Sequence, residues 1–330
     1  MKKQVTVLSL VILLSIVFVG CGSAGDEQAV VAEPVIADQD LDTEEKSEEE
    51  GTQIITYLGE AYEVPANAER IAISGALESM EDALVLGVEP IGAITVSGEF
   101  PEMFADIVGQ AESTGEKIQL NLEAILQMQP DVILGVIKFP EETLEQLEKI
   151  APTIPISHIA SDWEDNLMLL GELTGKEKEA QEAIDGYYER VAQVKEDMGS
   201  QYDDKSIVAI RVRRGNLFIY PEDIFFNAVL HEDLGLPVPE LVGAAQAQEN
   251  VSIEVFSELN PDYIFVQFEE SENVDTPDVL NDIQSNPIWQ SIEAVQNDNV
   301  FINVVDPLAQ GGTAWSKINF LEAFVDNLLD

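Results

Sequence analysis

The chain has 330 residues, of which 63 are acidic and 16 basic, and its formal net charge is −47 at pH 7. This length suits two domains of ordinary size. A charge so negative excludes nucleic-acid binding, which needs a basic face. It favours a secreted protein whose dense carboxylate surface keeps it soluble, as in an alkaline or saline habitat.

The N-terminus predicts export. Lys2 and Lys3 precede an apolar stretch from residue 5 to residue 19. This pattern is typical of a secretory signal peptide over residues 1–20, and it is too short to favour a transmembrane helix. Cys21 is the only cysteine and resembles the modified residue of a lipobox. We expect a lipid on Cys21 to anchor the protein at the extracellular face of the cell membrane; the alternative is a plain signal peptide.

The segment after the signal peptide predicts a tether at 21–53. Residues 22–51 are rich in Asp, Glu, Ser, Gly and Ala, and Lys46 is their only cation. Such a composition buries no core and repels itself. We therefore expect a disordered acidic tether, with folding that begins near Ile54.

Strands and helices alternate in the next part of the chain. The expected strands are at 70–74, 89–95, 132–136 and 154–159, and the expected helices are at 77–86, 122–129 and 141–150. Gly87 ends the first of these helices and Pro152 follows the last. This alternation is typical of α/β proteins.

A long amphipathic helix is expected at 176–199. Its apolar residues recur on one stripe at helical spacing: Ala180, Ile184, Tyr187, Tyr188, Val191 and Val194. The elements expected after it are strands at 207–212, 217–220 and 300–304 and helices at 224–234, 253–259 and 313–329. Strands that alternate with helices imply mainly parallel sheets.

A helix–turn–strand motif occurs twice in the chain. Asn121–Gly135 and Ser252–Val266 align without a gap. Each copy opens with a polar N-cap, carries a glutamate in its first turn, and reaches Pro-Asp before an apolar strand. The repeat predicts two similar lobes, with Glu123 and Glu254 at equivalent, exposed positions.

These patterns together predict an α/β fold of two lobes. The N-terminal lobe is expected at 54–175, the spine helix at 176–199 and the C-terminal lobe at 200–330. Ligands bind in clefts between such lobes, outside the ends of the strands. We expect the protein to be a monomer.

Scarce cations predict what lines this cleft. Arg211, Arg213 and Arg214 lie within four positions, and the first two share a strand face. Two adjacent guanidinium groups fit a pocket for an oxygen-rich anion, although surface salt bridges with nearby carboxylates are the alternative. Lys117 and Lys138 flank the first repeat unit and are expected to reach the cleft from the other lobe.

Enzyme chemistry has little support in the sequence. His158 and His231 are the only histidines, and no motif surrounds either. No nucleophile elbow, P-loop or Rossmann glycine fingerprint occurs. A transition-metal site would need a His/Cys cluster, which is absent, so we expect no protein-bound metal.

Several segments resemble one known family. They are Gly75–Asp82, Gly115–Lys117, Lys138–Pro140, Arg211–Asn216, Val266–Phe268 and Asp306–Ser316. By these residues the chain from Ile54 to Leu329 is similar to the helical-backbone substrate-binding lipoproteins of ABC importers for ferric siderophores, haem and cobalamin, above all to the ferric-catecholate receptors.

The resemblance implies a class III periplasmic-binding-protein fold, with two Rossmann-like lobes joined by one long spine helix. It also implies that a set of cations lines the basic cleft: Lys117, Lys138, Arg211 and Arg213. The protein would then be a receptor that delivers its ligand to the permease of an ABC importer.

Five further residues have roles implied by the resemblance. Gln248 matches a polar contact in the cleft. Gln246 stands where the family's receptor carries a lysine, and Arg214 where it carries a glutamine, so the cationic set is rearranged. Glu123 and Glu254 match glutamates at the lobe tips that dock onto arginines of the membrane permease.

The ligand implied by the resemblance is a ferric tris-catecholate, such as ferri-bacillibactin or ferri-enterobactin, with a net charge of about −3. No cofactor is expected, because the chelator itself supplies the oxygens around the iron. The alternatives are a receptor of the same fold for a ferric hydroxamate, ferric citrate, haem or cobalamin, and, less favoured, a surface enzyme. A neutral hydroxamate complex would not call for Arg211 and Arg213.

Overall fold

The computed structural model describes residues 51–329. The signal peptide expected at 1–20, Cys21 and most of the expected tether lie outside the described residues. The first strand, β1 (Thr52–Tyr57), pairs in antiparallel fashion with β2 (Glu60–Pro65), and the sequence did not predict this hairpin. Thr52 pairs with Pro65, so ordered structure begins two residues before the expected start at Ile54.

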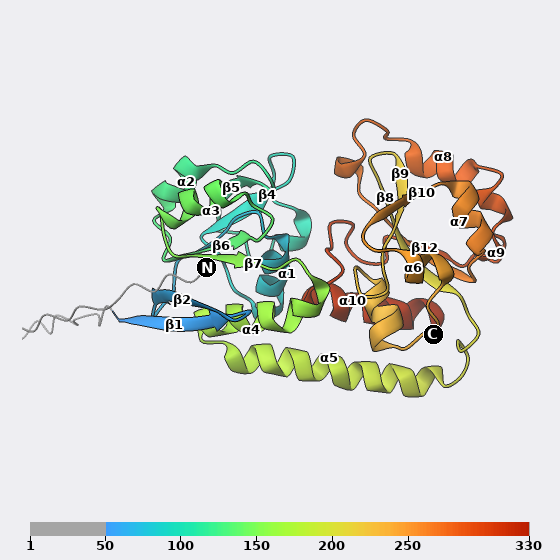
Figure 1. Ribbon diagram of the computed structural model, residues 1–330, viewed down its shortest axis with the longest axis horizontal. Helices are drawn as coiled ribbons and strands as arrows, with labels where there is room; N and C mark the ends of the chain where they lie inside the picture. The colour runs from blue at the N-terminus through green and yellow to red at the C-terminus, as the bar shows by residue number, and fades with distance from the viewer. Residues whose placement is uncertain (1–50, 330) are drawn as a thin grey trace, which may run out of the picture. The chain divides into compact units, whose positions relative to one another are not determined.

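The first lobe is built on a parallel sheet of five strands. Its elements are β3 (Ile71–Ile73), α1 (Leu77–Leu86), β4 (Gly92–Thr95), η1 (Glu102–Phe104), β5 (Glu112–Glu116), α2 (Leu122–Met128), β6 (Val132–Val136), α3 (Glu141–Glu148), β7 (Thr153–Ile156), η2 (Ala160–Asp162) and α4 (Trp163–Thr174). The strand order is β5-β4-β3-β6-β7. Helices α2 and α3 cover one face with Ile125 and Leu147, and α1 and α4 cover the other with Met80 and Leu167 (Figure 1).

The second lobe contains a mixed sheet of five strands. Its elements are β8 (Ile207–Arg213), β9 (Asn216–Ile219), η3 (Ala228–Asp233), α6 (Glu240–Ala244), β10 (Glu249–Val251), α7 (Ile253–Leu259), β11 (Tyr263–Phe268), η4 (Glu270–Glu272), α8 (Val279–Ser285), η5 (Trp289–Ser291), α9 (Glu293–Gln296) and β12 (Val300–Ile302). The strand order is β10-β9-β8-β11-β12.

Two features of the second lobe differ from the sequence-based expectation. Strands β9 and β10 are antiparallel to their neighbours, whereas mainly parallel sheets were expected. Arg214 and Gly215 both have positive φ and form the two-residue hairpin turn that reverses the chain after β8. The helix expected at 224–234 is a π-helix, η3, confined to Ala228–Asp233.

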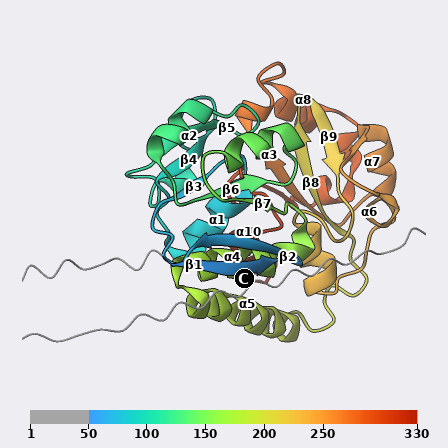
Figure 2. The same ribbon diagram turned by 60° about the vertical axis from the view of Figure 1, so that its left-hand side comes forward.

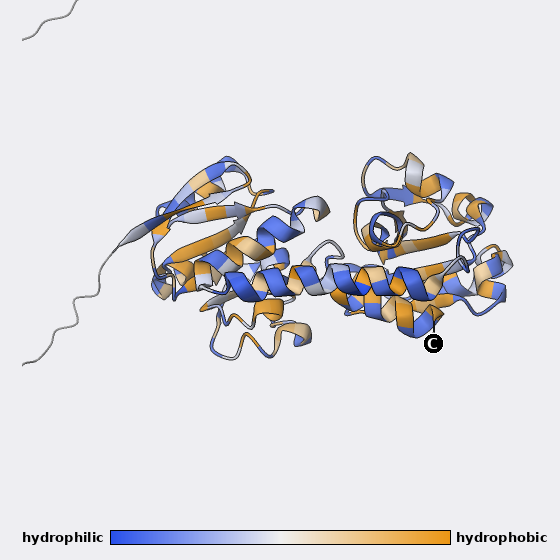
Figure 3. Cartoon of the chain, turned by 90° about the horizontal axis from the view of Figure 1, so that it is seen from below, coloured by the Kyte–Doolittle hydropathy of each residue, from blue (hydrophilic) through white to orange (hydrophobic). Residues whose placement is uncertain are grey.

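The spine helix is α5 (Glu177–Met198), which runs along both lobes (Figure 1). Its buried stripe includes Ala180, Ile184, Tyr187, Val191 and Val194, while charged residues cover its outer side (Figure 3). Tyr188, which the sequence placed on this stripe, is instead exposed, and its hydroxyl donates a hydrogen bond to Glu164.

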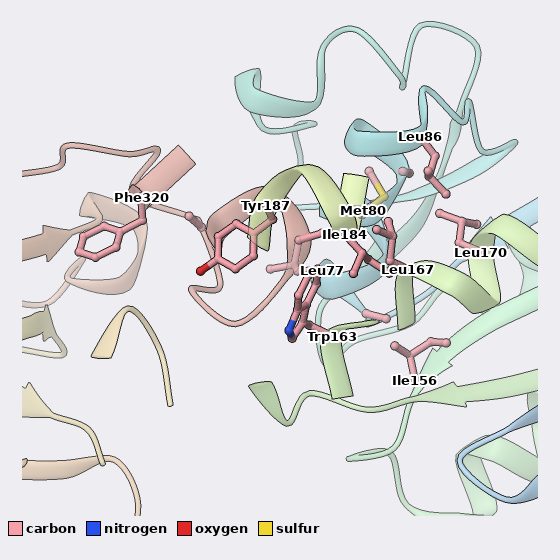
Figure 4. Packing of buried hydrophobic residues seen from close by; sticks show 14 of the residues in the cluster. Leu77, Met80, Leu86, Ile156, Trp163, Leu167, Leu170, Ile184, Tyr187 and Phe320 are labelled. Carbon is pink, nitrogen blue, oxygen red and sulfur yellow. The ribbon is translucent and has the colours of Figure 1, made fainter. Parts of the chain in front are cut away.

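Helix α10 (Ala314–Leu328) returns the chain end to the middle of the folded unit. It packs against α1, α4 and α5 (Figure 2). Phe320 and Tyr187 belong to the same hydrophobic core as Trp163 and Met80 (Figure 4). One continuous core therefore joins the inner faces of both sheets. Within residues 51–329, no helix is both long enough and apolar enough to cross a membrane.

Candidate functional site

The predicted cleft residues follow the carboxyl ends of parallel strands in both lobes. Lys117 follows β5 and Lys138 follows β6, whereas Arg211 and Arg213 lie at the end of β8. Ligands of open α/β sheets bind at this edge. The fold thus brings residues that are nearly a hundred positions apart in the chain to the edges of the sheets that carry binding sites.

Lys117 lies on a tight turn that reaches the second lobe. Gly115 has φ of +102°, and a Cβ there would lie 2.4 Å from the carbonyl oxygen of Gln119, so only glycine fits this turn. Lys117 Nζ donates a hydrogen bond of 2.9 Å to Gln310 Oε1. Gln310 follows β12, so this bond connects the two lobes.

Burial lowers the pKa of the Lys117 ammonium, and Arg211 and Lys138 lower it further, whereas Glu78 and Glu272 oppose them. Lys117 and Lys138 of the first lobe and Arg211 of the second therefore lie close enough for their charges to interact.

Lys138 lies on an exposed turn that a close aromatic contact holds. The adjacent Phe139 packs against Gly75, where a Cβ would lie 2.1 Å from the tip of the ring. Gly75 also has φ of +77°. A side chain at this position would displace Phe139 and, with it, the loop that carries Lys138.

The alternation of β8 places both arginines on one face. Val208 and Ile210 point into one core, and Ile207 points into the other. Arg211 and Arg213 lie on the same face of β8 as Ile207. Arg211 is 6% exposed. A guanidinium buried so deeply requires a partner.

That partner is Glu272, which the sequence did not single out. Glu272 Oε2 accepts a hydrogen bond of 2.9 Å from Arg211 Nε, and Oε1 lies 3.1 Å from Arg213 Nη2. The arginines therefore pair with a nearby carboxylate, which was the alternative to an anion pocket in the sequence analysis. The pair with Arg211 is partly buried, however, with the Arg211 side chain 7% and the Glu272 side chain 19% exposed, so it differs from a solvated surface salt bridge.

Arg213 has further neighbours in the second lobe. Its Nη1 lies 3.5 Å from Gln248 Oε1, so these two predicted site residues are neighbours. The hydroxyl of Tyr220 also lies against Arg213, and burial is the main cause of the raised pKa of this tyrosine. Arg213 Nε is buried without a hydrogen-bond partner in the described residues.

Two of the predicted cleft residues lie in exposed positions. Arg214 occupies the turn after β8, and its backbone N–H donates to Glu272 O. Gln246 is exposed, and its backbone N–H donates to Glu249. Among residues 51–329, neither side chain makes a hydrogen bond to Lys117, Lys138, Arg211 or Arg213.

Helices α2 and α7 present the two repeat glutamates in the same way. The Asn121 side chain caps α2 by accepting from the Ala124 N–H, and Ser252 caps α7 by accepting from the Val255 N–H. Glu123 and Glu254 are exposed in the first turns. Hydrogen bonds from its own backbone N–H and from Ser252 lower the pKa of Glu254.

Acidic and neutral groups that the sequence did not assign to the site lie near Lys117. Glu78 is 7% exposed, and its Oε2 has no hydrogen-bond partner among the described residues. It lines a cavity of about 40 Å³ together with Ser157, His158 and Gln310. Burial and Lys138 lower the pKa of His158, which keeps this ring neutral near pH 7. These residues carry no local motif, so only the fold reveals them.

A buried carboxyl group connects α1 to the segment before α10. Glu81 accepts hydrogen bonds from the backbone N–H of Gln310 (2.7 Å) and from the hydroxyl groups of Thr313 and Ser316. Gln310 in turn holds Lys117. The position of this cleft cation therefore depends on a network that begins at Glu81.

His231 is a buried residue of η3 itself, and burial lowers its pKa. Within residues 51–329, no cluster of three or more His, Cys, Asp or Glu side chains has an arrangement that could hold a metal ion. The cations identified from the sequence thus have carboxylate and amide neighbours.

Comparison with known proteins defines the class. Residues 73–303 match the periplasmic binding protein family, and the chain belongs to that family. It is therefore a substrate-binding protein and not an enzyme. This match, together with the structural similarities that follow, confirms the expected α/β fold of two lobes joined by a spine helix.

Individual relatives are specific to iron uptake. The chain is 47% identical over 326 residues to the iron-uptake system-binding protein of Bacillus subtilis, which covers 99% of each chain. A crystal structure of the triscatecholate siderophore binding protein FeuA from Bacillus subtilis, complexed with ferri-bacillibactin, matches with a TM-score of 0.80 and 52% identity, covering 84% of this chain and 98% of that one. The probable siderophore-binding lipoprotein YfiY of the same organism is 26% identical over 309 residues, covering 91% of this chain and 90% of the relative.

Proposed function

We propose that the protein captures a ferric siderophore outside the cell and delivers it to the permease of an ABC importer. The ligand is a tris-catecholate such as ferri-bacillibactin or ferri-enterobactin. The observation that carries this proposal is the convergence of Lys117, Lys138, Arg211 and Arg213 in a protein that is otherwise strongly acidic.

The energetics favour a ligand with several negative charges. Each contact between a cation and an anionic oxygen contributes roughly 4 kcal/mol at an effective dielectric constant near 20, before desolvation. Glu78 and Glu272 offset part of this attraction, but the four cations outnumber them. The acidic coat lies farther away and is screened by salt within about 10 Å. A trianionic complex that reaches both lobes therefore gains most.

The relatives support the same ligand class. FeuA, whose structure was solved with ferri-bacillibactin, shares 52% identity and nearly its whole length with this chain. The iron is cargo held by its chelator, so the protein itself supplies donors for the catecholate oxygens and no metal ligands. We propose that Arg213 Nε, which is buried without a partner, is one of these donors.

The partner and the location of the protein are proposed from Glu123, Glu254 and Cys21. We propose that Glu123 and Glu254 dock onto the two halves of the permease, because they occupy equivalent positions in the two lobes. We further propose that a lipid on Cys21 holds the protein at the extracellular face of the membrane. The name of the relative YfiY, a lipoprotein, supports this anchor.

The direct test is a titration of the purified protein with ferric catecholate, ferric hydroxamate and ferric citrate complexes while tryptophan fluorescence is followed. We expect the catecholate to bind most tightly and the neutral hydroxamate to bind poorly. Tight binding of the hydroxamate with none of the catecholate would overturn the proposal. Preferential binding of citrate would keep the class of receptor and change its ligand.

A further inference from the structure

Glu272 lies on a loop that is fixed to the hairpin bearing the arginines. The Asn273 side chain, 1% exposed, donates to Val212 O (3.1 Å) and to Glu269 O (2.8 Å), and it accepts from the Gly215 N–H. The Arg214 N–H donates to Glu272 O at 3.0 Å. The backbone that carries Glu272 is therefore held in place independently of its carboxylate.

The carboxylate uses one oxygen for each arginine. Oε2 accepts from Arg211 Nε, and Oε1 pairs with Arg213 Nη2. The two guanidinium planes are thereby oriented by a single fixed anion. The terminal nitrogens of Arg211 donate no hydrogen bond to any residue of 51–329, so they remain as donors beside those that Glu272 occupies.

This arrangement treats small and large anions differently. A single carboxylate or sulfate approaching the arginines meets Arg211 Nε and Arg213 Nη2 already engaged by Glu272, whose negative charge offsets that of one guanidinium and weakens the attraction. A polyanion that spans the cleft also meets Lys117 and Lys138 in the other lobe. Its additional contacts offset the repulsion from Glu272, whereas a small anion gains no such contacts.

We propose that Glu272 is a specificity-determining residue that excludes small anions from the cleft. It acts as an internal competitor: the arginines are available only to a ligand that engages the cations of both lobes at once. The inference rests on the proposed function, because it concerns the selectivity of the same site. It matters for a receptor exposed to an environment in which sulfate, phosphate and simple carboxylates far outnumber the chelate.

The test compares Glu272→Gln with Glu270→Gln. Both variants remove one negative charge from η4, but Glu270 is exposed and makes no contact with the arginines. The thermal midpoint of each protein is measured in sodium sulfate and in sodium chloride at equal ionic strength, without siderophore. Sulfate stabilises most folded proteins in a general way, so the readout is the difference between proteins.

We expect Glu272→Gln to gain a sulfate-specific rise in midpoint that the parent and Glu270→Gln lack. In a second arm, sulfate is expected to weaken ferric catecholate binding about tenfold for Glu272→Gln and less than twofold for the other two proteins. The ratio of the two dissociation constants is compared, so a change in absolute affinity does not affect the conclusion.

Three results would overturn the inference: a Glu272→Gln protein insensitive to sulfate, an equal gain in Glu270→Gln, or saturable sulfate binding by the parent. The last measurement needs no variant and can overturn the inference even where Glu272→Gln fails to fold. The sulfate arm is independent of the siderophore. Failure of the parent to bind ferric catecholate would therefore count against the proposed function, and the sulfate arm would still decide the role of Glu272.

Discussion

Glu81 is a carboxyl group buried between α1 and the segment that leads into α10. Burial raises its pKa to about 7 from an ordinary value of 4.5, although hydrogen bonds from Ser316, Thr313 and the backbone of Gln310 act in the opposite direction. The neighbouring Asp82 is also buried, and its pKa is raised by burial and by Glu81. At a given pH, both groups are therefore protonated to a greater extent in the folded protein than in the unfolded chain.

This environment predicts how stability depends on pH. A carboxyl group whose pKa is higher in the folded state than in the unfolded state stabilises the fold below the unfolded value, and this contribution is lost as the pH rises through the folded value. For Glu81 the window runs from 4.5 to about 7. With 1.36 kcal/mol per pKa unit, the loss is about 3 kcal/mol.

Glu81→Gln removes the titration and keeps the shape of the side chain. We expect its free energy of unfolding, relative to the parent, to rise by up to about 3 kcal/mol between pH 4.5 and pH 8, measured by urea denaturation. Glu89→Gln, which removes an exposed charge just after the same helix, serves as the control and should show no such trend. A difference that stays constant with pH would contradict the assignment.

Arg213 and Arg214 are a matched pair for the cleft. Arg213→Ala removes a donor beside Gln248 and Tyr220, and we expect ferric catecholate binding to weaken by about 10- to 150-fold, which corresponds to roughly 1.5–3 kcal/mol. Arg214→Ala removes the same charge from an exposed turn and should cost less than about threefold. Both variants are titrated with ferric catecholate, and their losses of affinity are compared. Equal losses would show that only the overall charge of the protein matters.

At the scale of elements, α2 and α7 are two copies of one structure. Their side-chain caps, exposed glutamates and left-handed C-caps at Gln129 and Asn260 correspond. We expect the Glu123→Ala/Glu254→Ala protein to lose siderophore uptake in cells and to keep its affinity in solution within about threefold, because exposed charges contribute little locally.

A control for this double variant is Glu141→Ala/Glu258→Ala, which removes two exposed charges, one from each lobe. It should support normal uptake. A large loss of ligand affinity in the Glu123/Glu254 variant would place these glutamates in the cleft instead and would remove the basis for a docking role.

Elements with strong local signals were predictable from the sequence. Helix α1 spans Leu77–Leu86 as expected, because Gly87 adopts the left-handed conformation that ends it. Strand β6 also has its expected bounds, since an apolar run follows Pro-Asp. The β1–β2 hairpin and the edge strand β10 were missed, because their pairing partners rather than their own residues define them.

The candidate site could be proposed from the sequence in part for the same reason. Scarce cations in an acidic chain stand out, so Lys117, Lys138 and the arginines were identified from their types and spacing. Glu272 lies in the run Glu269–Glu272, which reads as one more solvated stretch of a protein with 63 acidic residues. Its role depends on Asn273, which fixes the η4 segment to β8. No local sequence pattern predicts such a contact.

At the scale of the whole molecule, the predicted anchor determines where the receptor works. We expect Cys21→Ala to be released into the medium or to remain unprocessed, because the mutant lacks the residue that would carry the lipid. Fractionation of cells followed by immunoblotting measures the distribution. A mutant that is processed normally and stays at the membrane would show that another feature anchors the protein.

The packing of α10 has a consequence for the order of assembly. The last helix of the chain covers α1, near the beginning of the folded region, and Phe320 and Phe324 complete a core that starts with Leu77 and Met80. This core is therefore complete only when α10 is packed against α1. Contacts of such long sequence separation slow folding. Formation of the core thus depends on contacts between segments that lie far apart in the sequence, and it is expected to be slower than the formation of the local helices.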